Sequence, residues 1–409
     1  MAERSVDFLL IGGGVAAGSC ARALRRHGAD GDVLIVGREP DPPYNRPPLS
    51  KDYLRGESSK EKVLIRPERW YEENGVDLLT MTSVTNLDPG ERVATLSNKD
   101  RVRFDKALLA TGANVRILRV DGCQLDGIHY LRTLRNSDAL REEAEKAERI
   151  ALIGGSYIGT ELAASFTTMG KQCELIMLEK TTLERFYGRE VGAFCQRILT
   201  DHGVKVHGGQ ELERFEGSGD RVERVVTKSG LEIDCDFVVV GAGVQPDVRL
   251  AEQAGLDVDS GVLTDRYLET SAPGIFAAGD IAQYDSVVHD RRLRIEHWDV
   301  AHNHGKVAAA NMLGGKQVYD VVPYFWSDLA KWGTMMYVGP ASDWDEIWWR
   351  GSPDEGAFTA WYVKDGRLAG AFSVRRAEDL TIARQLIADK TEIAGMRAQI
   401  EDVDSELTA

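Results

Sequence analysis

Two segments of this 409-residue chain repeat one pattern: a short apolar run, a glycine-rich turn and a row of small residues. The first reads DFLLIGGGVAAGSCA over residues 7–21, and the second reads RIALIGGSYIGTELA over residues 149–163. Each is typical of the strand–turn–helix opening of a βαβ unit. Each is followed by an apolar run, DVLIV at 32–36 and CELIMLE at 173–179, that we expect to form the next parallel strand. The repeat predicts an α/β fold with two Rossmann-like dinucleotide-binding domains.

The first glycine turn has the spacing G-x-G-x-x-A, formed by Gly12, Gly14 and Ala17. In such a turn the first glycine allows the tight bend, the second lets the backbone approach a pyrophosphate, and the small third residue lets helix and strand pack closely. The N–H groups of the following helix point at the anion. Behind the second strand, Arg38 stands where a ribose-binding acid is usual and Glu39 follows it, so that either side chain could face the adenosine ribose.

The second glycine turn contains Gly154 and Gly159, with Ser156 at the central position. Serine is small, and its hydroxyl can donate a hydrogen bond to a phosphate. Glu179 lies twenty residues after Gly159, and we expect it at the end of its strand. A carboxylate there accepts hydrogen bonds from the ribose hydroxyls and repels a 2′-phosphate, so NADH is favoured over NADPH. The two turns together predict one FAD and one NAD(H).

Other segments fit this arrangement. Residues 132–149 read as an exposed helix, residues 237–240 (FVVV) as a buried strand, and residues 275–280 (IFAAGD) as a short strand that ends on Asp280. Open α/β sheets bind ligands at the carboxyl ends of their strands. Asp280 could therefore accept hydrogen bonds from the ribityl chain of a flavin.

The character of the sequence changes after about residue 322, where six of the eight tryptophans lie. FTAWYV and RLAGAFSV flank a turn at Asp365 and Gly366, which predicts an antiparallel hairpin, and residues 377–390 then read as a helix. These signals predict a smaller α+β domain at the C-terminus. The expected boundaries are 1–114 with 244–321 for a discontinuous FAD-binding domain, 115–243 for the NAD-binding domain and 322–409 for the C-terminal domain.

Composition argues against several kinds of protein. The formal charge of −15 disfavours binding to nucleic acid or to a membrane surface, and no apolar run is long enough to span a membrane. The first strand begins within a few residues of the start, which leaves no room for a signal peptide and predicts a cytoplasmic location. The five cysteines form no CxxC pair, so neither disulfides nor zinc is expected. His297, His302 and His304 do not share a helical face, and we expect no metal site there.

Five further motifs carry a specific resemblance. They are PPYNRPPLSKDYL (42–54), ALLATGA (107–113), TSAPGIFAAGD (270–280), RIEHWDVA (294–301) and PYFWSDL (323–329). Together with the two turns, they are spread along the chain almost from end to end. The chain resembles the ferredoxin reductase family of FAD flavoproteins, which includes putidaredoxin reductase, the reductases of aromatic-ring dioxygenases and apoptosis-inducing factor.

The resemblance implies a fold like that of glutathione reductase, without its redox cysteines, and it implies both cofactor sites. The residues expected to bind FAD are Gly12, Gly14, Ala16, Ala17, Arg38, Glu39, Arg46, Lys51, Val84, Ala110, Thr111, Gly112, Arg132, Gly279, Asp280, Glu296, His297 and Trp298. The residues expected to bind NAD(H) are Gly154, Gly155, Ser156, Tyr157, Ile158, Gly159, Glu161, Glu179, Gly241 and Gly243. The resemblance makes Lys51 and Glu161 a catalytic pair at the reactive edge of the flavin. Without it, Lys51 would read as a surface lysine; Glu161 is expected in the first turn of its helix.

The absence of thiols near the first turn decides between branches of this fold. Disulfide reductases of related architecture need a cysteine pair beside the flavin, and residues 38–60 contain no cysteine. The resemblance thus implies an NADH:ferredoxin oxidoreductase, in which NADH gives a hydride to FAD N5 and single electrons pass to an iron–sulfur ferredoxin that feeds an oxygenase. Two alternatives stay open: a monodehydroascorbate or quinone reductase with a small-molecule acceptor, and an NADH-responsive flavoprotein resembling apoptosis-inducing factor. A monomer or homodimer is expected.

Overall fold

The computed structural model describes residues 3–408, and contacts within the chain divide it into two compact units. Unit 1 comprises Met1–Asn45, Lys60–Asn114 and Gln245–Val321, and unit 2 comprises Arg46–Ser59, Val115–Val244 and Val322–Ala409. The segment Arg46–Ser59 thus belongs to the same unit as the expected NAD-binding and C-terminal domains. The division into three domains stays a prediction.

Unit 1 is built on a seven-stranded sheet. Its strands are β1 (Glu3–Ile11), β2 (Val33–Val36), β3 (Val76–Leu79), β4 (Val84–Asp88), β5 (Val93–Leu96), β6 (Arg101–Leu109) and β18 (Ile275–Ala277). The parallel part has the order β3-β2-β1-β6, with β18 beside the end of β6, while β5 and β4 continue from the start of β6 as antiparallel strands. The strand order reverses at β1, and open α/β sheets bind their ligands at such a switch point.

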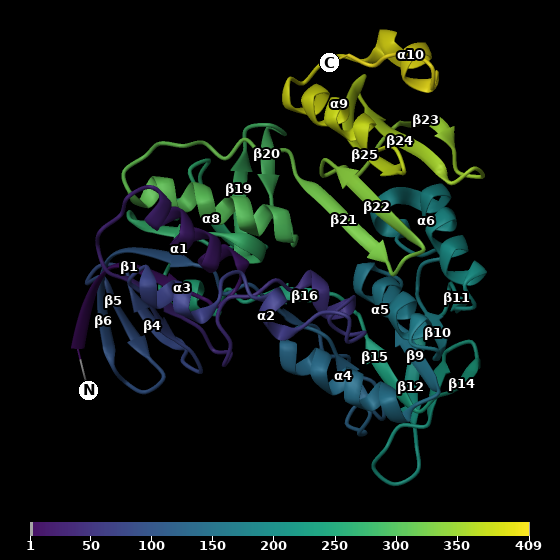
Figure 1. Ribbon diagram of the computed structural model, residues 1–409, viewed down its shortest axis with the longest axis horizontal. Helices are drawn as coiled ribbons and strands as arrows, with labels where there is room; N and C mark the ends of the chain where they lie inside the picture. Colours follow the sequence, from purple (N-terminus) through teal and green to yellow (C-terminus); the bar gives the residue numbers. More distant parts are fainter. Residues whose placement is uncertain (1–2, 409) are drawn as a thin grey trace. The chain divides into compact units, whose positions relative to one another are not determined.

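Two long helices of unit 1, α1 (Val15–Arg26) and α8 (Trp298–Met312), lie side by side (Figure 1). Gly305 of α8 permits this close packing, since a Cβ there would stand 2.3 Å from the carbonyl oxygen of Ala16. The shorter elements of the unit are α2 (Lys60–Val63), α3 (Glu68–Glu73), α7 (Arg249–Gln253), β17 (Val262–Thr264), the one-turn 3₁₀ helix η2 (Gly279–Ile281), β19 (Ala282–Ser286) and β20 (Arg291–Leu293).

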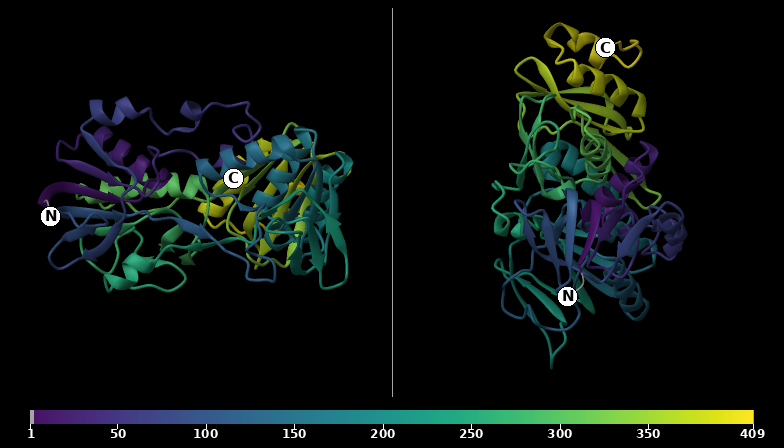
Figure 2. Two further views of the ribbon diagram at one scale, coloured as in Figure 1. Left: turned by 90° about the horizontal axis from the view of Figure 1, so that it is seen from below. Right: turned by 90° about the vertical axis from the view of Figure 1, so that its left-hand side faces the viewer.

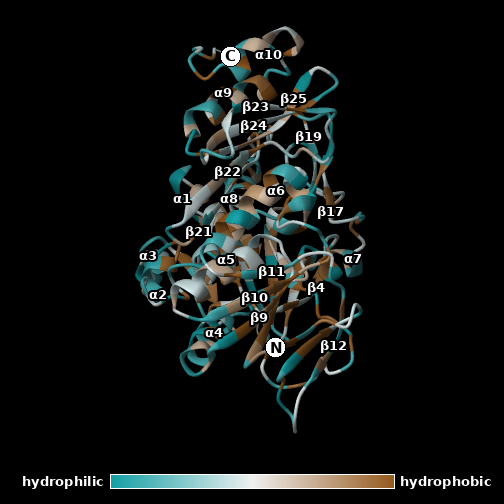
Figure 3. Cartoon of the chain, turned by 90° about the vertical axis from the view of Figure 1, so that its right-hand side faces the viewer, coloured by the Kyte–Doolittle hydropathy of each residue, from teal (hydrophilic) through white to brown (hydrophobic). Residues whose placement is uncertain are grey.

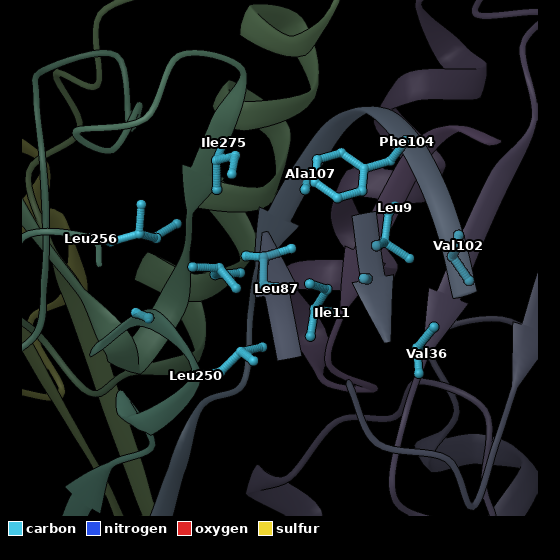
Figure 4. Close-up of a cluster of buried hydrophobic side chains, with 14 of the residues drawn as sticks. Leu9, Ile11, Val36, Leu87, Val102, Phe104, Ala107, Leu250, Leu256 and Ile275 are labelled. Carbon is cyan, nitrogen blue, oxygen red and sulfur yellow. The ribbon is translucent and has the colours of Figure 1, made fainter. Parts of the chain in front are cut away.

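The core of unit 1 explains why the first apolar run becomes a strand. Leu9 and Ile11, two residues apart on β1, share one face of the sheet. They belong to a buried cluster with Val36 of β2, Phe104 of β6 and Leu250 of α7 (Figure 4). Phe8 and Leu10, on the opposite face of β1, are buried as well. Burial on both faces is typical of a central parallel strand, and it explains why this run is continuously apolar.

The parallel sheet of unit 2 repeats the plan. Its strands are β8 (Ile128–Tyr130), β9 (Arg149–Ile153), β10 (Gln172–Ile176), β11 (Lys205–His207) and β15 (Phe237–Val240), in the order β11-β10-β9-β15-β8. The switch point lies at β9, which leads into the second glycine turn. The prediction that Glu179 ends its strand is wrong, because β10 stops at Ile176. Met177 is buried and prolongs the apolar run, although the strand pairing has ended.

Three helices of unit 2 accompany this sheet: α4 (Leu134–Lys146), α5 (Tyr157–Thr168) and α6 (Glu184–Asp201). The helix predicted within 132–149 is confirmed as α4, which begins in a capping box formed by Thr133 and Asn136 and is largely hydrophilic (Figure 3). The smaller elements are η1 (Pro47–Ser50) and the antiparallel strands β12 (Leu212–Glu216), β13 (Arg224–Thr227) and β14 (Glu232–Asp234). The chain crosses from one unit to the other in β7 (Ala113–Val115) and β16 (Val244–Pro246).

The C-terminal part of unit 2 is a five-stranded antiparallel sheet with helices, which confirms the α+β prediction. Its strands are β21 (Tyr324–Leu329), β22 (Gly333–Val338), β23 (Glu346–Ser352), β24 (Ala357–Lys364) and β25 (Arg367–Val374). Asp365 and Gly366 both have positive φ and form the predicted hairpin turn between β24 and β25. The predicted helix is α9 (Ala377–Ala388), which lies against β25; after η3 (Ala394–Met396), α10 (Arg397–Glu401) lies against β23 (Figure 2). No helix within residues 3–408 is long and apolar enough to cross a membrane.

Candidate functional site

The two glycine turns have the same backbone geometry. Gly12 has φ +128°, and a Cβ there would stand 2.1 Å from the carbonyl oxygen of Ala110. Gly154 has φ +106°, and a Cβ there would stand 2.4 Å from the carbonyl oxygen of Gly241. These φ values favour glycine, and the distances leave no room for a side chain. Each turn requires its first glycine because the backbone of a neighbouring segment lies directly against it.

The helices that follow the two turns, α1 and α5, begin without support from side chains. Neither has a side-chain cap, and neither has an acidic residue in its first turn. Every other helix of eight or more residues within residues 3–408 has one or the other: α4 and α8 are capped, and α6 and α9 begin with acidic residues. A cap typically contributes about 1 kcal/mol to stability. Uncapped N–H groups at a helix N-terminus bind anions, and the pyrophosphate of a dinucleotide is such an anion.

The central residues of the turns share one conformation, although one is glycine and the other serine. Gly14 has φ −96° and ψ −171°, and Ser156 has φ −85° and ψ −172°. A Cβ at Gly14 would meet no described neighbouring atom within 4 Å, so the protein itself does not require glycine there. A ligand that approaches the backbone does require it, and the pyrophosphate of FAD fits that demand. The Ser156 side chain does not cap α5, so its hydroxyl can serve a phosphate.

An acidic residue follows the second strand in each half of the repeat. Glu39 stands three residues after the end of β2, and Glu179 stands three residues after the end of β10. The hydroxyl of Tyr44 donates a hydrogen bond to Oε2 of Glu39 at 2.5 Å. The carboxylate of Glu179 has no hydrogen-bond partner within residues 3–408. Glu179 is therefore available to the ribose of a nucleotide, while Glu39 is already engaged.

Exposed apolar side chains accompany the second turn. Ile158, Leu178 and Phe186 are three of the seven large hydrophobic residues that are exposed within residues 3–408. Leu178 directly precedes Glu179 and is 66% exposed, and the ring of Phe186 lies 5.1 Å from that of Tyr157. The flat rings of a nucleotide can pack on such surfaces. The sequence does not indicate these two side chains as binding residues: Leu178 belongs to the run 173–179, which predicts a buried strand, and Phe186 lies in α6.

A second segment of unit 1 meets the first turn at Gly279. This residue has φ +78°, and a Cβ there would stand 3.4 Å from the Cβ of Ala16 and 3.3 Å from that of Ala301. Asp280 follows in η2, three residues beyond the end of β18, so the prediction that it ends the strand is wrong. Thr111 and Gly112 lie at the end of the neighbouring β6, where both bond to the backbone of Asp247. The structure thus brings η2 and the N-terminus of α1 together.

Several residues expected to contact FAD have partners within unit 1. These are Arg38 with Asp247 (3.2 Å) and Asn114 (2.5 Å), Val84 with the hydrophobic core, Glu296 with Arg294 (2.5 Å), His297 with the N–H of Asp299 (3.3 Å) and Trp298 with Asn45 (2.7 Å). His297 acts as the cap of α8. The contacts of these residues with FAD stay predictions.

In unit 2, Lys51 and Glu161 form a buried ion pair. Nζ of Lys51 lies 3.2 Å from Oε1 of Glu161, and only 10% of the lysine side chain is exposed, so the interpretation of Lys51 as a surface lysine is wrong. The hydroxyls of Ser50 and Ser327 donate to Oε2 and Oε1 of Glu161 at 2.5 and 2.6 Å. Oδ2 of Asp328 lies 3.6 Å from Nζ of Lys51. The lysine is thus shared between two carboxylates, one of which is held by two serines.

The sequence indicates this pair only through the family resemblance, and it does not indicate the residues that hold the pair in place. Ser50 directly precedes Lys51, and Ser327 and Asp328 stand in the PYFWSDL motif, so all three lie in segments already singled out. Glu161 lies in the second turn of α5 and not in the first, because the helix begins at Tyr157. Near this network, the guanidinium of Arg46 donates to the carbonyl oxygen of Arg132, so two further predicted residues meet within unit 2.

Comparison with known proteins identifies the family. The sequence profile of the pyridine nucleotide-disulphide oxidoreductases matches residues 6–305, and the profile of the reductase C-terminal domain matches residues 324–409. The chain belongs to this family. It is 34% identical over 388 residues to the ferredoxin--NAD(+) reductase component of the anthranilate 1,2-dioxygenase system of Burkholderia cepacia, with 93% of this chain and 94% of that protein covered.

Solved structures place the chain among the ferredoxin reductases of this family. The ferredoxin reductase for the CYP199A2 system of Rhodopseudomonas palustris matches with a TM-score of 0.94 and 31% identity, over 98% of both chains. A covalent putidaredoxin reductase–putidaredoxin complex matches with a TM-score of 0.91 and 31% identity, over 95% of this chain and 94% of the other. The predicted resemblance and the fold of two Rossmann-like domains with a smaller C-terminal domain are confirmed. Oxidoreductases of this family use FAD and NAD(P)H.

The cysteines of this family member do not support disulfide chemistry. Cys20, Cys173, Cys195 and Cys235 are buried, Cys123 is half-buried, and all five are free thiols. Burial raises the pKa of Cys173 to about 11 and that of Cys235 to about 12. Thiols with raised pKa values stay protonated near neutral pH and are poor nucleophiles.

Proposed function

We propose that the protein is an NADH:ferredoxin oxidoreductase that passes electrons to an iron–sulfur ferredoxin serving an oxygenase. The observation that carries this proposal is the pair of uncapped glycine turns, for FAD in unit 1 and for NADH in unit 2. The anthranilate dioxygenase component and the putidaredoxin complex support a ferredoxin as the acceptor. A bound flavin supplies the chemistry, since it accepts a hydride and releases electrons singly. The cytoplasmic location and the monomeric or homodimeric state stay predictions.

The chain's own residues would bind and orient the reactants. The N-termini of α1 and α5 would hold the two pyrophosphates through their uncapped N–H groups. Glu179 would accept hydrogen bonds from the NADH ribose and repel the 2′-phosphate of NADPH. Lys51, fixed by Glu161, would present a positive charge to the flavin, as the family resemblance implies.

A cluster of cations on unit 1 fits an acidic protein partner. Four cations have no ion-pair partner within residues 3–408. They are Arg22 and Arg26 of α1, Lys306 of α8, and Arg66, which lies between α2 and α3. Partial burial, and then the charges of Arg66 and Arg26, lower the pKa of Arg22. Partial burial, together with Arg22 and Arg26, lowers the pKa of Lys306 against the opposite effect of Asp299. These cations repel one another in a chain of net charge −15, and we propose that they receive an acidic face of the ferredoxin.

Steady-state oxidation of NADH tests the acceptor. We expect fast turnover with a dioxygenase-type [2Fe–2S] ferredoxin as acceptor and slow turnover with quinone or monodehydroascorbate alone. Equal turnover without ferredoxin would support the small-molecule reductase. A long-lived charge-transfer complex with NADH and little turnover would support a protein like apoptosis-inducing factor.

Charge reversal tests the docking cluster. Arg22→Glu combined with Arg26→Glu should raise KM for the ferredoxin at low salt by about tenfold, since close charge pairs are worth more than 1.4 kcal/mol in such interfaces. Reduction of ferricyanide, which needs no docking, should not change. Arg101→Glu at the start of β6 is the control, because this exposed arginine lies outside the cluster. A KM that changes equally in both variants would show only the effect of net charge.

A thiol-blocking experiment separates this reductase from disulfide reductases. Alkylation under native conditions should leave the reduction of FAD by NADH nearly unchanged, because four of the five thiols are buried and none forms a disulfide. Reduction is followed by the loss of flavin absorbance, and retention of FAD is checked in the same spectrum. Loss of reduction with full retention of FAD would contradict the thiol-free pathway.

A further inference from the structure

Three histidines lie in helix α8 or cap it, and each has a separate contact in unit 1. His297 caps the helix. Nδ1 of His302 is hydrogen-bonded to the hydroxyl of Ser19 at 2.8 Å, and its ring stacks on Trp298. His304, two residues further along the helix, is fully buried. Within residues 3–408, no group of three or more histidine, cysteine or acidic side chains is placed so that it could hold a metal ion.

His304 accepts a hydrogen bond from the main chain. The N–H of Gly279 donates to Nδ1 of His304 at 3.3 Å. Nδ1 is therefore unprotonated and the ring proton stands on Nε2, which has no hydrogen-bond partner in the described residues. The rings of Tyr284 and Tyr319 meet the imidazole edge-on at 4.7 and 4.3 Å between centroids. Burial lowers the pKa of His304 to about 3, so the ring is neutral and keeps this acceptor near neutral pH.

The hydrogen bond of His304 acts on a turn with little freedom of its own. Gly279 has φ +78°, opens η2, and is followed directly by Asp280. The side of Gly279 on which a Cβ would stand faces Ala16, in the first turn of α1, and Ala301 of α8. Without the imidazole, the N–H of Gly279 would be buried without an acceptor, and the turn would move to find one. Any such movement would shift Gly279 away from Ala16 of α1 and would move Asp280, the next residue, with it.

We infer that His304 is a positioning residue for FAD: by accepting a hydrogen bond from the N–H of Gly279, it fixes the turn that carries Asp280 against the first turn of α1, directly after the glycine turn. The inference rests on the proposed function, in which this part of unit 1 holds FAD. His304 itself need not touch the cofactor. This role explains why α8 places a polar ring in the buried interior of unit 1, although its Nε2 has no hydrogen-bond partner in the described residues and an apolar side chain could pack there.

The release of FAD from the holoenzyme tests the inference. His304→Phe keeps an aromatic ring between the two tyrosines but has no hydrogen-bond acceptor. His304→Leu removes both the aromatic ring and the acceptor. We expect FAD to dissociate about tenfold faster from either variant, because a buried N–H has lost its acceptor. His304→Asn should restore slow release, since its side-chain oxygen can take the place of Nδ1. Tyr284→Phe is the matched control, because it removes a hydroxyl that has no partner and leaves the edge-on packing.

Release is followed by the fluorescence of free flavin after dilution, and the visible spectrum of the bound flavin should change in the Phe and Leu variants only. Two different replacements are used because either variant alone could be misfolded. Thermal unfolding shows whether each variant is folded. The inference is wrong if a folded Phe or Leu variant releases FAD at the unmodified rate, or if the Asn variant releases it as fast as the Phe variant. Failure of the proposed function is distinct, since the unmodified protein would then hold no FAD or would not reduce ferredoxin.

Discussion

The two glycine turns of the molecule share a backbone and differ in their side chains. Gly12 and Gly154 occupy equivalent positions against a neighbouring carbonyl group, and α1 and α5 both begin uncapped. The fifth residue of α1 is Ser19, whereas the fifth residue of α5 is Glu161. The backbone conformation that suits a dinucleotide phosphate thus occurs twice in the chain. The two sites differ in a few side chains.

The partners of Ser19 and Glu161 show what this difference does. Ser19 is hydrogen-bonded to His302, and burial lowers the pKa of that histidine to about 4, so α1 and α8 are joined by a neutral contact. Glu161 instead holds Lys51 in a buried ion pair. A buried charge is costly unless it is paired and hydrogen-bonded, and such a fixed charge is useful where charge develops in a reaction. We therefore expect α1 to serve binding and α5 to serve binding and chemistry.

Substituting the first glycine of each turn should have the largest effect. A methyl group at Gly12 or at Gly154 would meet a carbonyl oxygen at 2.1 or 2.4 Å. We expect Gly12→Ala to lose FAD and at least about 3 kcal/mol of stability, because the strained φ and the backbone contact act together. Gly154→Ala should lose NADH binding but keep FAD. Flavin absorbance of the purified proteins and NADH titration measure both results; loss of both ligands in both variants would mean that the turns are not independent.

Breaking the ion pair of α5 should come next in size. Lys51→Ala leaves Glu161 and Asp328 without their cation, whereas Glu161→Ala leaves Lys51 with Asp328 at 3.6 Å. Lys51→Ala should therefore lower the FAD reduction potential and slow flavin reduction by about a hundredfold, and Glu161→Ala should slow it less. Stopped-flow reduction by NADH and a reference-dye measurement of the potential test this order.

Ser19→Ala is the matched control on α1, since it removes the equivalent side chain without touching a charge. It should change flavin reduction by no more than about twofold, because the net contribution of a neutral hydrogen bond is small. A potential and a rate that are unchanged in a folded Lys51→Ala variant would show that the pair is only structural.

Exchanging the central residues should have a smaller and one-sided effect. Gly14→Ser introduces a Cβ that meets no described protein atom within 4 Å, so the folded protein should be as stable as before. FAD affinity should fall by about thirtyfold, roughly 2 kcal/mol, because the side chain occupies the approach of the pyrophosphate. Ser156→Gly should alter NADH affinity by less than about threefold, since the two residues share one conformation. Equal FAD affinity in the Gly14→Ser variant would show that FAD binding does not require glycine at position 14.

The sequence predicts the turns well and the ion pair poorly, for a physical reason. The turns at Gly12 and Gly154 are recognised from the spacing of glycines that are close together in the sequence. The burial of Lys51 depends on Glu161 and Asp328, which stand far away along the chain, and only the family resemblance pointed to the first of them. The end of β10 was misjudged because burial continues at Met177 after pairing stops. A run of apolar residues indicates which part of the chain is buried. It does not indicate where a strand ends, because a strand ends where its backbone hydrogen bonds to the neighbouring strand end.

The acidic residues behind the second strands give the smallest expected difference. Glu39 and Glu179 stand at equivalent distances from β2 and β10, yet Glu39 is bonded to Tyr44 and Glu179 has no partner within residues 3–408. A carboxylate without a protein partner is free to accept the ribose hydroxyls of NADH and to repel the 2′-phosphate of NADPH. The unmodified protein should therefore prefer NADH by at least about tenfold in kcat/KM, about 1.4 kcal/mol. Glu179→Ala should narrow that preference by raising KM for NADH, whereas Glu39→Ala should leave it unchanged, because its nearest turn is the one assigned to FAD. Steady-state kinetics with both nucleotides decide the matter: equal use of NADH and NADPH by the unmodified protein, or an equal response to both substitutions, would contradict the assignment of the second turn to NADH.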